Sequence, residues 1–138
     1  MTIDSAGGAR MADESRTERR ELGDRIRREV LGDEHVERSS RNADPFTAPM
    51  QDLVTEYCWG VAWGDDRLDR KTRSLLNIVM MVALDRQHEL ELHTKGALNN
   101  GVTTDEIQAA LTQAMVYCGV PAGMEGFRTV AAVFKAQD

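Results

Sequence analysis

The stretch RKTRSLLNIVMMVAL, Arg70–Leu84, decides the fold that we expect for this chain. Asp69 precedes it as a plausible N-cap, and after Ser74 the predicted helix is apolar on nearly every side. A helix of that kind must be buried centrally or covered by another subunit. Because a chain of 138 residues has a limited interior, we favour a subunit interface.

The segments after this helix carry recognisable boundaries. Asn99-Asn100-Gly101 is a strong helix stop, and Thr103 with Glu106 forms a capping box that opens the next helix. Gly119-Val120-Pro121 then breaks the pattern. The helices expected here cover about 87–99, the capping box to 117, and about 122–136.

The segments before it are helical as well. Ser15 and Glu18 form another capping box, and Gly32 fits the left-handed position that ends a helix. We predict a helix to about 31, a turn-prone stretch over 39–49 and a helix over 50–63. No segment alternates with the period of a strand, so the fold class is all-α: one helical-bundle domain over 14–138 after a flexible tail, 1–13.

Composition limits the partners and the compartment. The net charge of −6 disfavours nucleic acid and anionic lipid, and the longest apolar run, 78–84, is far short of the roughly 20 residues of a membrane span. Arginines within 16–28 alternate with acids, which favours a solvated helix face with ion pairs. Cys58 and Cys118 form no metal-binding or disulfide pattern. We therefore expect a reduced, cytoplasmic protein.

The two histidines of the segment HELELH do not predict a metal site. His88 and His93 are five residues apart, which places them roughly 140° apart around a helix, whereas a zinc-protease motif needs a spacing of four. Glu89 and His93 do have that spacing, so their side chains share a face. A carboxylate beside an imidazole makes an acid or base that works near neutral pH, and a surface ion pair is the competing interpretation.

A polar stripe crosses the apolar helix. Arg70, Arg73 and Asn77 lie at offsets of three and four, and arginine presents a fork that matches carboxylates. The stripe either binds an anion or pairs with a buried acid such as Glu56. The nearby aromatic Trp59 is typical of a core or interface. No phosphate-binding glycine loop and no nucleophile elbow occurs in the sequence.

In combination, several motifs resemble the carboxymuconolactone decarboxylase family. The likeness covers about Arg20 to Val133. The stretches that carry it are Glu56-Tyr57-Cys58-Trp59-Gly60, LDRKTRSL at 68–75, ELELH at 89–93, Asn99-Asn100-Gly101-Val102-Thr103 and Tyr117-Cys118-Gly119-Val120-Pro121.

The resemblance implies an all-helical subunit that assembles into a ring-like homo-oligomer, a trimer or hexamer, with active sites near subunit contacts. A related branch uses a CxxC followed four residues later by histidine. If His93 is aligned with the histidine of that motif, the two cysteines of the motif correspond to Arg86 and Glu89 in this chain. Disulfide exchange therefore cannot occur at these positions.

The implied reaction is cofactor-free decarboxylation of γ-carboxymuconolactone, a small lactone carboxylate, to an enol-lactone in aromatic-acid breakdown. No metal or cofactor is needed because the electrons left behind spread into the lactone carbonyl. His93 held by Glu89 is the catalytic candidate, and the substrate-binding candidates are Arg73, Arg70, Glu56 and Trp59. The alternatives are a decarboxylase or isomerase of another lactone or keto acid, and a non-catalytic helical assembly protein.

Overall fold

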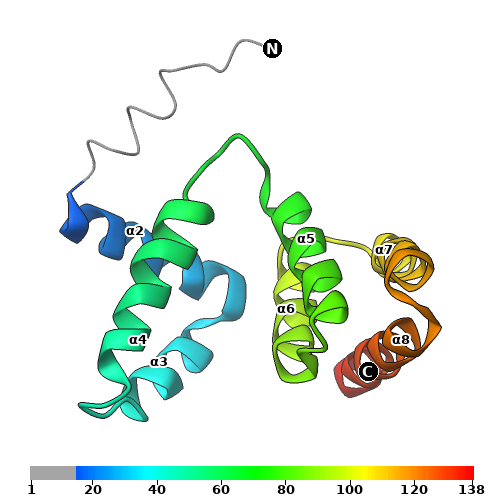
Figure 1. The fold of residues 1–138 in the computed structure, drawn as a ribbon. Coiled ribbons are helices and arrows are strands. Elements are labelled where there is room, and N and C mark those ends of the chain that lie inside the picture. The colour runs from blue at the N-terminus through cyan, green and yellow to red at the C-terminus, as the bar shows by residue number, and fades with distance from the viewer. Residues whose placement is uncertain (1–14) are drawn as a thin grey trace. The chain divides into compact units, whose positions relative to one another are not determined.

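The computed structural model describes residues 15–138, so the expected tail, 1–13, lies outside the described residues. The described chain is all-helical and contains no strand, as the sequence predicts (Figure 1). Its elements are α2 (Arg16–Leu31), α3 (Asp33–Arg41), α4 (Ala48–Leu53), the π-helix η1 (Val54–Ala62), α5 (Arg70–Ala83), α6 (Gln87–Asn99), α7 (Thr104–Cys118) and α8 (Val120–Gln137). None of these helices is long and apolar enough to cross a membrane.

The chain divides into two compact units along the sequence. The first ends at Arg67, and the second runs from Leu68 to Asp138. The first therefore holds α2, α3, α4 and η1, and the second holds α5 to α8. The expectation of one domain over 14–138 stays a prediction.

The first unit begins with the predicted capping box. The hydroxyl of Ser15 accepts from the Glu18 backbone at 3.2 Å, and α2 ends at Gly32, whose φ of 91° suits glycine. The helix α3 was not predicted, and it extends into the stretch expected to be turn-prone. Val36 is its single apolar residue, so no repeating apolar pattern in the sequence predicts a helix there.

The predicted helix over 50–63 exists, but it begins at Ala48 and changes into the π-helix η1 at Val54. Two glycines let α2 and η1 pack backbone against backbone. A Cβ on Gly23 would lie 1.9 Å from the carbonyl oxygen of Thr55, and one on Gly60 would lie 2.3 Å from that of Arg19. Only glycine fits at such a contact, which explains why a residue unfavourable in a helix stands inside each element.

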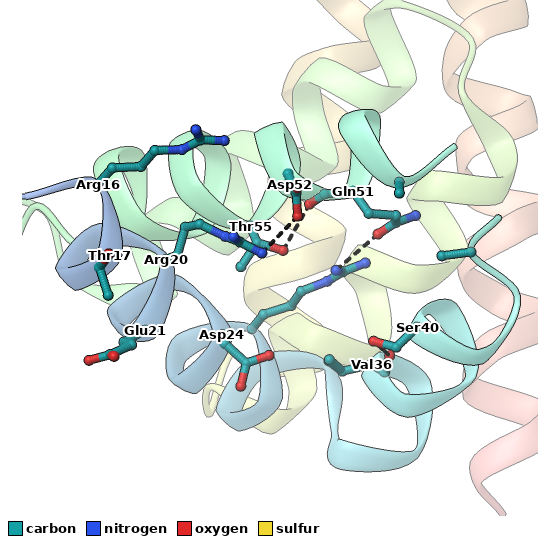
Figure 2. A pocket seen from close by; sticks show the side chains of 13 residues that line it. Arg16, Thr17, Arg20, Glu21, Asp24, Val36, Ser40, Gln51, Asp52 and Thr55 are labelled. Carbon is teal, nitrogen blue, oxygen red and sulfur yellow. Dashed lines mark hydrogen bonds and ion pairs between the residues drawn. The ribbon is translucent and has the colours of Figure 1, made fainter. Parts of the chain in front are cut away.

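A cleft of about 800 Å³ opens on the first unit (Figure 2). Side chains from α2, including Arg20 and Asp24, line it together with Val36 and Ser40 from α3 and Gln51 from α4. Beside it, the core of this unit is formed by Ile26, Val30, Trp59 and Trp63.

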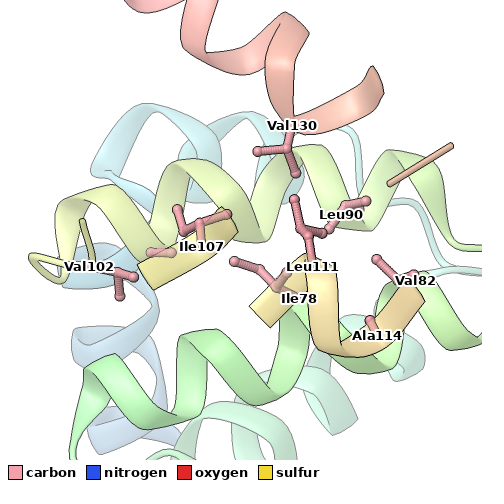
Figure 3. Close-up of a cluster of buried hydrophobic side chains, with 9 residues drawn as sticks. Ile78, Val82, Leu90, Val102, Ile107, Leu111, Ala114 and Val130 are labelled. Carbon is pink, nitrogen blue, oxygen red and sulfur yellow. The ribbon is translucent and has the colours of Figure 1, made fainter. Parts of the chain in front are cut away.

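The second unit follows the predicted boundaries closely. Asp69 caps α5 by accepting from the Thr72 backbone at 2.8 Å, α6 covers 87–99, and Thr103 caps α7. Its core draws on all four helices and on the loop before α7 (Figure 3). The core residues are Ile78, Val82, Leu90, Ala97, Val102, Ile107, Leu111, Ala114 and Val130.

The apolar helix α5 is buried on one face only. Ile78 and Val82 are fully covered, whereas Leu76 and Met80 are each 46% exposed. Four helices are too few to surround it, so the apolar side chains of its other face stay accessible. The expectation that another subunit covers this face stays a prediction.

Candidate active site

The polar stripe predicted from the sequence lies on α5 in the second unit. Arg70 is the first residue of the helix and is exposed, and Arg73 and Asn77 follow at one-turn intervals, both half-buried. The cap supplied by Asp69 fixes where the helix begins, and with it the direction of the stripe. Two cationic side chains thus precede a neutral amide along a single helix face.

The helix α6 carries the predicted acid–base pair. Glu89 lies in its first turn and is exposed, and His93 follows one turn later and is half-buried. The Nδ2 atom of Asn77 lies 3.3 Å from Nδ1 of His93, so the stripe on α5 reaches the imidazole on α6. The contact places the side-chain amide of Asn77 against Nδ1 and leaves Nε2 to other partners.

Nearby contacts fix the register of α5 against α6. The Nδ2 atom of Asn100 donates to the Ser74 hydroxyl at 2.9 Å, and both Ser74 and Thr94 are buried. The hydroxyl of Thr94 donates to the Leu90 carbonyl at 2.7 Å and so stays within its own helix. The helix face that carries His93 is therefore anchored by the core behind it, as a site that holds a reacting group must be.

Glu56, a predicted substrate-binding residue, lies in the first unit on η1. Its side chain is 3% exposed, and its two oxygens accept from Arg19 Nη2 at 2.9 Å and Arg16 Nε at 3.2 Å. The Arg19 hydrogen bond, aided by the charges of both arginines, lowers the pKa of Glu56. The sequence argument that Glu56 is a buried acid is confirmed, and α2 supplies the partners that the structure gives it.

Trp59, the other candidate on η1, packs in the core of the first unit. It is buried, and its ring centroid lies 4.9 Å from that of Trp63. This placement agrees with the interpretation of these aromatics as core residues. The substrate-binding roles of Glu56 and Trp59 stay predictions.

Asn77 makes a contact that sequence reasoning missed. Its place in the stripe was evident, but its contact with His93 depends on the register between two helices, which no local pattern encodes. Among residues 15–138, no group of three or more His, Cys, Asp or Glu side chains could hold a metal ion.

Comparison with known proteins gives two similar enzymes and one family. The profile of the carboxymuconolactone decarboxylase family matches residues 48–132. The chain is 50% identical over 103 residues to nitrosuccinic acid decarboxylase of Metarhizium robertsii, covering 75% of this chain and 72% of that protein. It is 38% identical over 118 residues to 4-carboxymuconolactone decarboxylase of Acinetobacter baylyi, covering 86% of this chain and 88% of that protein.

Proposed function

This chain belongs to the carboxymuconolactone decarboxylase family and is a decarboxylase, and from that premise we propose that its substrate is a small dicarboxylic acid with a succinate backbone. The two similar enzymes are named for substrates with this feature in common. In 4-carboxymuconolactone, also called γ-carboxymuconolactone, and in nitrosuccinic acid, one carbon bears both a carboxylate and a carboxymethyl group. That carbon is also joined to an electron acceptor, either an unsaturated lactone or a nitro group.

The shared backbone suggests one course for the reaction. The bond between this carbon and its carboxylate breaks, CO2 leaves, and the bonding electrons move into the acceptor, where the charge rests on oxygen. A proton then adds to carbon, and the carboxymethyl group is unchanged. Because the substrate itself delocalises the electrons, the reaction needs no cofactor.

We assign γ-carboxymuconolactone as the first candidate substrate. It is supported by the resemblance of the motifs and by a named relative of which the chain covers 88%. Nitrosuccinic acid is the second candidate, and the 50% identity to an enzyme named for it is the observation that favours it.

The residues on α5 and α6 have distinct roles in this proposal. The fork of Arg73, with Arg70 at the helix start, binds the carboxymethyl group that is retained. His93, protonated and stabilised by Glu89, donates its Nε2–H to the oxygen on which charge develops and then gives this proton to carbon, which leaves the ring neutral. Asn77 positions the imidazole, and its contact with Nδ1 is the observation that carries the assignment.

We also propose that the chain self-associates through the apolar face of α5. Leu76 and Met80 are each 46% exposed, and burial of such side chains against a second copy is favourable. A trimer or hexamer is the assembly that we expect.

Decarboxylation of both acids by the purified, chelator-treated protein tests the proposal. We expect CO2 release from γ-carboxymuconolactone, and His93→Ala should lower the turnover number by about 10²–10⁴-fold without changing the helical circular dichroism. His88→Ala is the matched control, because His88 is an exposed histidine of the same helix.

Comparing CO2 release from the two acids distinguishes the two candidate substrates. Faster release from nitrosuccinic acid would favour the second candidate and keep the assigned residues. Release from neither acid by a folded protein would contradict the proposed substrate class, and full activity of His93→Ala would contradict the proposed site.

A further inference from the structure

The cleft of the first unit contains a buried arginine that has no acidic hydrogen-bond partner. Arg27 lines the cleft and is only 8% exposed. Its Nη1 donates to Gln51 Oε1 at 3.2 Å, and its Nε is buried without a hydrogen-bond partner among the described residues. The sequence predicted a solvated, ion-paired helix face here, and for Arg27 that prediction is wrong. Burying a cation against one neutral partner is costly, so such arginines are rare unless an anion accompanies them.

The neighbouring residue shows the ordinary arrangement. Arg28 is half-buried and contacts three carboxylates, those of Asp24 at 2.9 Å, Asp33 at 3.4 Å and Glu37 at 3.7 Å. Burial lowers the pKa of Arg27, and the attraction of Asp24 does not outweigh it. Asp24, the acid that attracts Arg27, thus hydrogen-bonds to Arg28 and leaves Arg27 undercompensated.

The remaining charges of the cleft are partly committed to one another. Asp52 accepts from Arg20 Nη2 at 2.7 Å, and this pair is nearly half exposed (Figure 2). Exposed ion pairs contribute little stability, so Arg20 can turn toward an incoming anion at low cost. Glu21 is exposed on the same wall. Glu21 is solvated, so the buried charge of the cleft that lacks an ion pair among the described residues is the cation Arg27.

We propose that this cleft binds a small organic carboxylate, with its carboxylate on the Arg27 guanidinium and Arg20 beside it. Since Gln51 occupies Nη1 and Nε is covered by the protein, Nη2 is the guanidinium nitrogen left to donate a charge-assisted hydrogen bond to the carboxylate. A cleft of about 800 Å³ is large enough for a metabolite of this class. This site lies wholly within the first unit and does not depend on the proposed function.

Succinate is the probe, and intrinsic tryptophan fluorescence is the readout. The two tryptophans of the chain, Trp59 and Trp63, lie in the same core cluster as Ile26, the residue before Arg27. We expect a saturable change when succinate is added to the wild-type protein at constant ionic strength, with sodium chloride as the balancing salt. Arg27→Gln should weaken succinate binding by about 10–100-fold, because a charge-assisted hydrogen bond is lost. Arg25→Gln, an exposed change on the same helix, should bind as the wild type does.

Stability separates a ligand-binding role from a purely structural one. Without succinate, Arg27→Gln should melt at the same temperature as the wild type or higher, because a buried cation has been removed. With succinate, only proteins that retain Arg27 should be stabilised. If Arg27→Gln does not fold, the test passes to Arg27→Lys, which keeps the charge and should fold and bind succinate more weakly than the wild type. Failure of both variants to fold would show that Arg27 is structural and would overturn the proposal.

The competing location for succinate is the site on α5. Arg73→Gln should keep the tryptophan response if the cleft binds succinate. Loss of the response in Arg73→Gln with full binding by Arg27→Gln would place succinate on α5 and overturn the proposal. No saturable response in the wild type would overturn it as well.

Discussion

At the scale of single residues, the contact between Asn77 and His93 makes a prediction about the acidity of the imidazole. Asn77→Asp places a carboxylate 3.3 Å from Nδ1, where it stabilises the protonated ring and raises the pKa of His93. The limb of the pH profile of kcat/KM that depends on His93 should therefore move to higher pH. Asn77→Ala should instead lower kcat by about 3–10-fold, as expected for one lost hydrogen bond. Unchanged profiles in both variants would show that Asn77 does not position His93.

The ion pairs of Glu56 lead to a prediction of how the stability of the first unit depends on pH. Hydrogen bonding to Arg19 lowers its pKa below the ordinary 4.5, so the folded state favours the ionised form. Its contribution to stability is present above about pH 4.5 and is lost as the pH falls through the lower, folded-state pKa. Glu56→Gln should be less stable at pH 7 and should lose less stability between pH 7 and acid than the wild type does.

Urea unfolding at several pH values measures this difference. Asp66→Asn, an exposed change in the same unit, is the control and should keep the wild-type dependence. If the curve of Glu56→Gln runs parallel to that of the wild type, Glu56 does not couple folding to protonation.

At the scale of the elements, the contact between α2 and η1 tolerates no side chain at Gly23. A Cβ there would lie 1.9 Å from the Thr55 carbonyl oxygen, and backbone atoms cannot rotate away as a flexible side chain does. Gly23→Ala should therefore destabilise the first unit by about 1–3 kcal/mol or more, despite the higher helix propensity of alanine. Thermal unfolding followed by tryptophan fluorescence tests this, with Arg25→Ala as the control on the same helix. Equal or higher stability of Gly23→Ala would contradict the close packing.

The cap of α5 gives a second prediction at this scale. Asp69→Ala removes the acceptor for the Thr72 amide and should cost about 1 kcal/mol, whereas Asp69→Asn keeps an acceptor and should cost less. Chemical unfolding of the two variants compares them directly. Equal losses would mean that charge, rather than the hydrogen bond, stabilises the helix start.

Helix ends were predictable where a local signal encodes them, and longer-range features were not. Ser15, Asp69 and Gly101 act on backbone groups within a few residues, so the boundaries they mark could be predicted from the sequence. The glycine contact between η1 and α2 joins segments that are separated in the chain, so no local signal predicted it. The candidate site follows the same division: the pairing of Glu89 with His93 is a prediction from spacing, whereas the contact of Asn77 with His93 arises from the packing of two helices.

At the scale of the whole molecule, the exposed apolar face of α5 predicts a concentration-dependent assembly. Met80→Glu places a charge among side chains that we expect to be buried between copies, so it should shift the protein toward smaller species. Analytical ultracentrifugation measures the distribution. Gln137→Glu adds the same charge at an exposed position near the C-terminus and should leave the assembly unchanged. Identical distributions for wild type and Met80→Glu would exclude this face as the interface.

The division at Arg67 and Leu68 has a consequence for how the protein is made. Each unit is a continuous segment of chain whose helices pack on one another, so neither must wait for a distant segment to complete its core. Small helical units with local contacts fold within microseconds to milliseconds, whereas a ribosome adds only about 5–20 residues per second. The N-terminal half therefore has several seconds to acquire structure while the C-terminal half is still being translated. The order of synthesis is then also the order of folding.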